Sequence, residues 1–194
     1  GLILLRAPLV ALLYQRGAFT ARSTDLVAWA LLWYAAGLVG HTLVEILSRA
    51  FYALHDTRTP VVVGVITMGL NIVFSLLFST LFSQIGWMPH GGLALANSLA
   101  TALESIALIF LMRRRLQGLE GGYIWQGVGI SLLGTGLMSA VVLGWLALFS
   151  GGSRVVIVAG SLGFGLAAYL GLMWLLKMPE LRGMMRTLLE KIKR

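Results

Sequence analysis

Five long apolar runs follow one another along the chain, and short polar segments separate them. A helix of about 20 residues crosses a hydrocarbon layer of about 30 Å, and each of these runs is long enough to do so. The runs are continuously apolar rather than alternating, so they predict membrane-spanning helices and not the strands of a barrel. The predicted spans are Leu26–Ser48, Pro60–Ser83, Gly92–Met112, Gly127–Phe149 and Val155–Leu176.

Composition agrees with this pattern. The chain is 58% hydrophobic and 11% charged, and its mean hydropathy is +0.89, which is more apolar than one soluble core of 194 residues requires. The sequence has no cysteine, which excludes disulfides, thiolate metal sites and a cysteine nucleophile. We therefore expect an all-α, polytopic transmembrane bundle.

The segment before the first span, Gly1–Tyr14, is apolar but too short to span and contains Arg6 and Pro8. We interpret it as the end of a helix whose beginning is missing. A signal peptide is the alternative, but no small-residue cleavage site precedes the polar residues that follow. The expected organisation is a truncated helix and outer loop over residues 1–25, a five-span bundle over residues 26–176, and a tail over residues 177–194.

The 15 basic residues are distributed unevenly between the two predicted sides of the membrane. Because basic loops stay in the cytoplasm, the side with eleven of them is predicted to be cytoplasmic and to include the C-terminus. Nucleic-acid binding is the rival explanation of the net charge of +8, but no soluble basic segment contains interleaved stacking aromatics. The eleven are Arg49, Arg58, Arg113, Arg114, Arg115, Lys177, Arg182, Arg186, Lys191, Lys193 and Arg194. The other side has Arg16, Arg22 and Arg154, and Arg6 lies in the truncated helix.

A short charged corner, Leu47–Val61, joins the first two predicted spans. Thr59 stands before Pro60, and a hydroxyl residue followed by proline is a typical helix start, so Thr59 is predicted to cap the second span. Asp56 and Arg58 add opposite charges to the same corner. They are either part of a capped connection or part of a gate that makes contacts in only one transport state.

Ionisable residues on the first span share one helix face, because His41, Glu45 and Arg49 recur every four residues. Glu45 stands N-terminal to Arg49, which is the favourable order for a helical ion pair. The face either neutralises itself near the cytoplasmic end or lines a transport cavity. Transition-metal binding is not expected, because two ligands without a third do not make a zinc site.

Oxygen-bearing side chains form a stripe on each of the next two spans. Consecutive spans joined by a short loop pack side by side, so the two stripes are predicted to meet and to provide ligands for a small monovalent cation, sodium or proton. The alternative is interhelical hydrogen bonding that only joins the helices. The stripes are Thr67, Asn71 and Ser75 on the second span and Asn97, Thr101, Glu104 and Ser105 on the third; the cation-site candidates are Asn71, Ser75, Asn97, Thr101 and Glu104.

Small residues at four-residue spacing predict smooth packing faces on the last two spans. One face has Gly136, Ala140 and Gly144, and the other has Ala159, Gly163, Ala167 and Gly171. The tail after Pro179 alternates apolar and basic residues at helical spacing. It is predicted either as an interfacial helix on anionic lipid headgroups or as a solvated charged segment.

Three motifs resemble one known family, the MurJ/MviN lipid II flippases. The corner resembles its R-x-F-Y and D-x-R/K-T-P pattern, with Arg49–Tyr52 followed by Asp56–Pro60. Leu12–Thr20 resembles the family's L-[FY]-x-R-G-x-F-T segment, and Gly92–Ser98 resembles its G-[LV]-A-L-A-[TN]-S helix start. The motifs are weak singly and specific in combination, and they cover about half of the chain.

The resemblance implies a two-lobe fold of fourteen helices, related to multidrug and toxic-compound exporters, in which this chain runs from the end of the ninth helix to the fourteenth. It implies a C-terminal lobe of an inner-membrane flippase that moves an undecaprenyl-pyrophosphate-linked peptidoglycan precursor by alternating access. The family's pyrophosphate-binding arginines lie mainly in helices that this chain lacks. The alternatives are an exporter of drugs or other polyprenyl-linked glycans, and a membrane enzyme acting on lipid-linked sugars with Glu45 or Glu104 as base.

Overall fold

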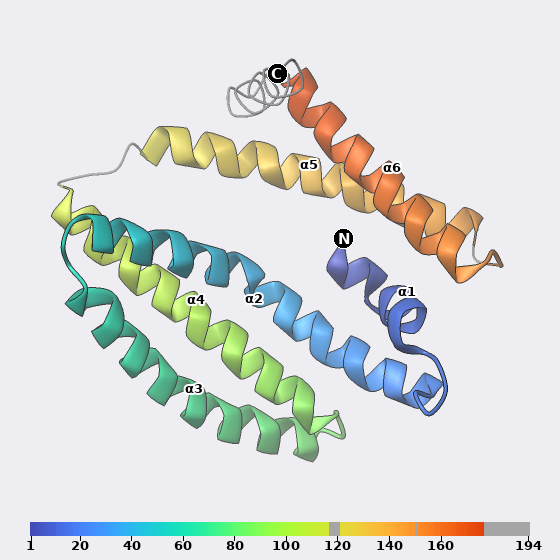
Figure 1. Ribbon diagram of the computed structural model, residues 1–194, viewed down its shortest axis with the longest axis horizontal. Coiled ribbons are helices and arrows are strands. Elements are labelled where there is room, and N and C mark those ends of the chain that lie inside the picture. Colours follow the sequence, from blue (N-terminus) through green and yellow to red (C-terminus); the bar gives the residue numbers. More distant parts are fainter. Residues whose placement is uncertain (117–120, 150, 177–194) are drawn as a thin grey trace. The chain divides into compact units, whose positions relative to one another are not determined.

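The computed structural model describes residues 1–116, 121–149 and 151–176 (Figure 1). Six α-helices occupy this part of the chain, and five of them are long and apolar enough to cross a membrane. The five predicted spans are therefore confirmed as helices. The helices are α1 (Leu2–Tyr14), α2 (Ala21–Ala53), α3 (Arg58–Gln84), α4 (Pro89–Arg115), α5 (Gly121–Leu148) and α6 (Arg154–Leu175).

Local sequence explains where the helices begin. The Thr20 hydroxyl accepts a hydrogen bond from the Ser23 amide at 3.4 Å, and the Ser153 hydroxyl accepts one from the Val156 amide at 3.4 Å. Each satisfies one of the first-turn amides that have no partner within the helix. Because Thr20 starts α2 at Ala21, the helix begins five residues before the predicted span and includes part of the predicted outer loop.

The chain divides into two compact units, which are described separately. One is formed by Leu13–Leu119 together with Leu2, and its helices are α2, α3 and α4. The other contains Gly1, Ile3–Leu12 and the chain from Glu120 onward, and includes most of α1 with α5 and α6. Whether all five spans form a single bundle stays a prediction.

In the α2–α4 unit, α4 lies between α2 and α3 and packs against both, whereas α2 and α3 barely touch each other. Near the corner the core is formed by Phe51, Leu108 and Met112, which are almost fully buried. At the opposite end the rings of Trp29, Trp33, Phe82 and Trp87 form an aromatic cluster with centroids 5.2–6.5 Å apart. The unit is thus closed by packed side chains at both ends, and its polar residues lie between them.

The α5–α6 contact differs from the prediction. A Cβ built on Gly134 meets the Tyr169 ring at 3.0 Å, one on Gly160 meets the Trp145 ring at 2.3 Å, and one on Gly165 meets Val142 at 2.9 Å. By contrast, nothing lies within 4 Å of a Cβ built on the predicted-face glycines Gly136, Gly144, Gly163 and Gly171. Other glycines therefore make the close approach, each accommodating a bulky side chain of the facing helix.

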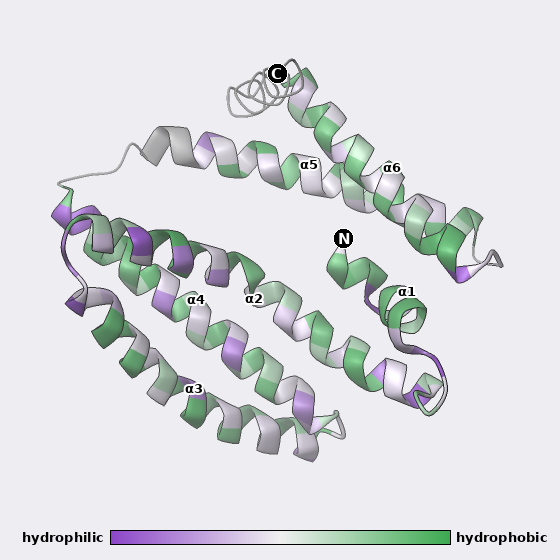
Figure 2. Cartoon of the chain, in the orientation of Figure 1, coloured by the Kyte–Doolittle hydropathy of each residue, from purple (hydrophilic) through white to green (hydrophobic). Residues whose placement is uncertain are grey.

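Many large apolar residues of the long helices are exposed, as expected for helices that face lipid, and hydrophobic positions are green in the ribbon of Figure 2. The exceptions are polar positions within α2, α3 and α4 and at the corner between α2 and α3. Six of the polar residues within these helices line one cavity.

Candidate functional site

Helices α2, α3 and α4 line an open cavity of about 260 Å³. Six polar side chains line it, and Val44, Met68 and Ala100 complete the wall together with Gly64. The polar residues are His41, Thr67, Asn71, Asn97, Thr101 and Glu104. Thr67 and Asn71 of the second span share this cavity with Asn97, Thr101 and Glu104 of the third, as predicted, and His41 of the first span joins them. That the cavity holds a cation stays a prediction.

Glycines on α2 bring α4 close enough for this arrangement. A Cβ built on Gly37 would lie 2.8 Å from the Ser98 Cα, and one on Gly40 would lie 3.4 Å from the Thr101 carbonyl carbon. The Ser98 hydroxyl donates to the Trp33 carbonyl oxygen at 2.7 Å, which fixes the two helices at this level. His41 follows one turn after Gly37, so its side chain reaches the polar residues of α4.

His41 joins α2 to α4 through its Nε2 atom, which lies 3.0 Å from Asn97 Oδ1 and 3.5 Å from Thr101 Oγ1. The Thr101 hydroxyl donates its hydrogen to the Asn97 carbonyl oxygen at 3.0 Å, so towards His41 it presents a lone pair. With Asn97 Oδ1 and Thr101 Oγ1 as acceptors, the tautomer that satisfies both contacts has its hydrogen on Nε2. In that tautomer His41 donates to α4.

Glu104 joins α4 to α3. The Thr67 hydroxyl lies 3.1 Å from Glu104 Oε2 and also 3.1 Å from each of the carbonyl oxygens of Val63 and Gly64. The other carboxylate oxygen lies against Gly64, where a Cβ would approach it to 3.4 Å. The small residue at position 64 thus leaves room for the carboxylate between the helices.

Two polar residues of the predicted stripes lie outside the cavity wall. Ser75 donates to Asn71 Oδ1 at 3.2 Å, and so acts on a lining residue without lining the cavity itself. Ser105 is buried and donates to the Ala102 carbonyl oxygen at 2.8 Å within α4. A periodic stripe is therefore wider than the part of the helix that faces the cavity.

The predicted ion pair between Glu45 and Arg49 forms, and both side chains are exposed, at 63% and 76% respectively. Neither residue lines the cavity. On this helix face only His41 points to the neighbouring polar residues, and the other two neutralise each other.

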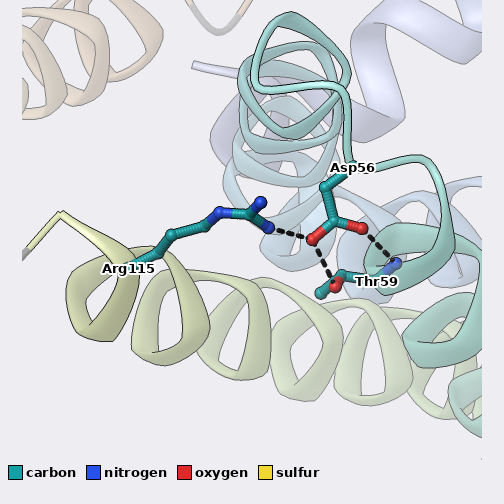
Figure 3. A network of polar contacts seen from close by, with 3 residues as sticks. All are labelled: Asp56, Thr59 and Arg115. Carbon is teal, nitrogen blue, oxygen red and sulfur yellow. Dashed lines mark hydrogen bonds and ion pairs between the residues drawn. The ribbon is translucent and has the colours of Figure 1, made fainter.

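At the corner, Asp56 rather than Thr59 is the capping residue, which corrects the prediction. Asp56 Oδ1 accepts from the Thr59 amide at 3.1 Å, and Oδ2 accepts from the Thr59 hydroxyl at 2.8 Å (Figure 3). The first helical residue of α3 is Arg58, which is exposed, and Thr57 before it makes no capping bond. A carboxylate three residues ahead of an amide is a strong first-turn acceptor, and it leaves the Thr59 hydroxyl as a donor.

The Asp56 carboxylate also pairs with Arg115 in the last turn of α4, so one side chain ties the corner to the end of a third helix (Figure 3). The hydrogen bond from the Thr59 amide, followed by that from its hydroxyl and the charge of Arg115, holds the pKa of Asp56 below its ordinary value of 3.8. Sequence analysis missed Arg115, which lies 59 positions further along the chain.

The basic tail, including Arg182 and Lys191, lies outside the described residues. The described part defines a class of protein. It is a polytopic helical membrane protein that places ionisable and amide side chains around a cavity at membrane depth, as transport proteins do.

Comparison with known proteins gives the family. The family model described as "Lipid II flippase MurJ" matches residues 1–163, and the chain belongs to this family. A lipid II flippase MurJ from Burkholderia cenocepacia is 32% identical over 186 residues, and a probable lipid II flippase MurJ from Vibrio cholerae is 29% identical over 188. Each alignment covers 91% of this chain and 34% of the relative, so the chain spans about a third of their length.

A solved structure shares the fold. The lipid II flippase MurJ in an inward closed conformation superposes with a TM-score of 0.72 at 24% identity. The match covers 90% of this chain and 34% of that one. The predicted fold class, an all-α arrangement of membrane-spanning helices, agrees with this match.

Proposed function

We propose that this chain forms the C-terminal portion of a bacterial inner-membrane flippase that moves a lipid-linked peptidoglycan precursor outward by alternating access. The observation that carries the proposal is the family match over residues 1–163. The relatives are named for lipid II, and the proposed substrate class is an undecaprenyl-pyrophosphate-linked sugar.

The polar cavity supports a transport role. A charged, sugar-bearing headgroup crosses hydrocarbon only where polar groups replace its water, and ionisable residues at membrane depth mark such paths. We assign the cavity residues Asn71, Asn97, Thr101 and Glu104, with Ser75 supporting Asn71, to the site of a coupling cation. His41 is the cavity residue of α2, and Glu45, Arg49, Asp56 and Arg58 are the gate candidates nearer the corner.

The proposed orientation places the C-terminus and the corner in the cytoplasm. Its support is the excess of basic residues on that side, including Arg113, Arg114 and Arg115 at the end of α4. The basic tail is proposed to contact anionic headgroups. Cysteines introduced singly at Thr57 and Ser23 test the orientation with an impermeant thiol reagent on intact cells. Ser23→Cys should react and Thr57→Cys should not. The reverse labelling would show the opposite topology and contradict the proposed orientation.

Family membership favours the flippase over the two alternatives, an exporter and an enzyme acting on lipid-linked sugars. The discriminating experiment uses the full-length protein in liposomes with a fluorescent lipid-linked precursor in one leaflet. The proposal expects the precursor to reach the other leaflet chemically unchanged. Recovery of a hydrolysed or transferred product would support the enzyme, and movement of unrelated drugs instead of the precursor would support the exporter.

A further inference from the structure

Helix α1 contains one charged side chain, Arg6, within an otherwise apolar sequence. The helix ends at Tyr14, whose ring centroid lies 6.0 Å from that of Phe19 in the connection to α2. Tyrosine is typical of the membrane–water interface, and Arg6 stands eight residues before Tyr14, a rise of about 12 Å along the helix. Arg6 therefore lies at membrane depth, where an ionisable side chain needs a partner.

Arg6 is on the packed face of α1. Leu5 and Val10 are almost fully buried, at 1% and 3% exposure, and at about 3.6 residues per turn Arg6 falls between them around the helix. Arg6 itself is partly buried. A Cβ built on Gly1, one turn before Leu5, would lie 3.8 Å from Met138 Cε of α5. The arginine is thus on the side of α1 that faces protein.

The Arg6 guanidinium points away from the Tyr14 end of the helix. Cα–Cβ bonds tilt toward the N-terminus of a helix, and Arg6 Nη1 donates to the Ile3 carbonyl oxygen at 2.7 Å, one turn further from Tyr14. This bond does not compensate for Pro8, because the amide that proline lacks would bond the Leu4 carbonyl. The side chain therefore neither extends to the interface at Tyr14 nor repairs the helix.

No acidic side chain pairs with Arg6 among the described residues. Those of its own compact unit include no aspartate or glutamate. The carboxylates of Glu45 and Asp56, in the α2–α4 unit, form ion pairs with other arginines. A guanidinium stays charged and has five N–H donors, so several donors are available to an anion besides the one bound to Ile3.

A phosphate group borne by a lipid suits this position. The planar guanidinium matches two phosphate oxygens at once through parallel, charge-assisted hydrogen bonds. Free phosphate stays in water, whereas the phosphate of a translocated lipid must pass through membrane depth with its headgroup. We propose that Arg6 binds the phosphate group of the lipid-linked substrate during this passage. The inference rests on the proposed transport function and adds to it a substrate-binding residue on α1.

The experiment measures binding of three lipids by the full-length protein in detergent: a fluorescent lipid-linked pyrophosphate precursor, the phosphate-free polyprenol, and phosphatidylglycerol as a bulk phospholipid. The wild type should bind the precursor at least about tenfold more tightly than the polyprenol. Arg6→Gln removes the charge but keeps a donor for the Ile3 carbonyl, so a purely structural role predicts wild-type binding.

We expect Arg6→Gln to bind the precursor at least about tenfold more weakly than the wild type. Arg6→Lys keeps the charge without the planar fork and should be intermediate. The matched control is Arg22→Gln, which removes an exposed arginine from the first turn of α2 and should leave binding unchanged. Wild-type precursor binding by Arg6→Gln would overturn the proposal. An equal loss of phosphatidylglycerol binding would also overturn it, because it would identify a site for bulk lipid.

Chemical modification tests the same contact in the wild-type protein, even if Arg6→Gln fails to fold. Phenylglyoxal should modify Arg6, and the precursor should protect it where the polyprenol does not, as measured by mass spectrometry of the α1 peptide. Equal modification of Arg6 with and without the precursor would overturn the proposal. A wild type that binds the precursor no better than the polyprenol would instead refute the proposed function.

Discussion

The α2–α4 unit and the α5–α6 pair use glycine in the same way but differ in what lies beside it. In both, glycines allow close approach, at Gly37 against Ser98 and at Gly160 against Trp145. In the α2–α4 unit, polar side chains cross between helices next to that approach, through His41 to Asn97 and Thr67 to Glu104. Among the described residues of α5 and α6 the contact is mostly apolar, with a long hydrogen bond of 3.4 Å from Trp145 Nε1 to the Val156 carbonyl oxygen.

This difference distinguishes contacts that pack the helices from polar contacts that are available for transport. Small residues at helix contacts explain how membrane helices associate, and both regions have them. Only the α2–α4 unit, among the described residues, adds polar side chains that bridge helices around a cavity. The α2–α4 unit is therefore where changes should affect transport more than folding.

The largest effect is expected from the carboxylate in the cavity. Glu104→Gln should lower transport on the order of tenfold, equivalent to about 1.4 kcal/mol of coupling, at near-normal membrane abundance. Asp25→Asn, an exposed carboxylate at the start of α2, is the control and should behave as wild type. Cell-wall complementation together with immunoblotting measures both quantities. Normal complementation by a combined Glu104→Gln, Asn97→Ala variant would show that these cavity residues serve only helix packing.

A glycine-to-alanine substitution should affect protein stability differently in the two regions. Gly37→Ala places a methyl group against the backbone of Ser98 and should destabilise the protein by about 1–3 kcal/mol. Gly163→Ala adds the same group to α6 where nothing lies within 4 Å, so it should change stability little. Thermal unfolding in detergent compares the two. Equal midpoints would show that the close approach of α2 and α4 is not needed for stability.

At the corner, the capping role of Asp56 predicts an order of effects. Asp56→Ala removes the acceptor of two hydrogen bonds and the partner of Arg115, whereas Thr59→Val removes one donor and keeps the amide contact. Asp56→Ala should therefore lower the unfolding midpoint more than Thr59→Val. The opposite order would identify Thr59 as the capping residue.

A smaller effect on the unfolding midpoint is expected when the pH is lowered. Because the folded-state pKa of Asp56 lies below its ordinary value, the stability that this group contributes is present above pH 3.8 and is lost as pH falls through the lowered value. The unfolding midpoint of the wild type should decrease over that range, and the midpoint of Asp56→Asn should decrease less. Asp25→Asn is the matched control and should retain the wild-type decrease.

Sequence alone predicted the spans well, because runs such as Pro60–Ser83 are long, apolar and bounded by polar residues. It also predicted the pair Glu45–Arg49, which depends only on helical spacing within one element. Contacts between distant elements were harder. Spacing places His41 on a face but does not say which helix that face meets, so its approach to Asn97 was missed.

The same limit explains the other differences. The partner of Asp56, Arg115, lies on a helix two elements further along the chain, and no local pattern connects them. Regular spacing favoured Gly136 and Gly163 as packing residues, but the crossing of α5 and α6 selects Gly134 and Gly165 instead. The crossing depends on large neighbours such as Tyr169, whose position the spacing of glycines does not specify.

The most direct test of the shared cavity is a double-mutant cycle on translocation rate in the full-length protein, with His41→Gln, Glu104→Gln and their combination. If the two side chains serve one site, the first substitution abolishes its function and the second has no further effect. The double variant should then translocate as fast as the slower single variant, with a coupling energy of about 1 kcal/mol or more. Rates that decrease multiplicatively would show two independent roles and contradict a shared site.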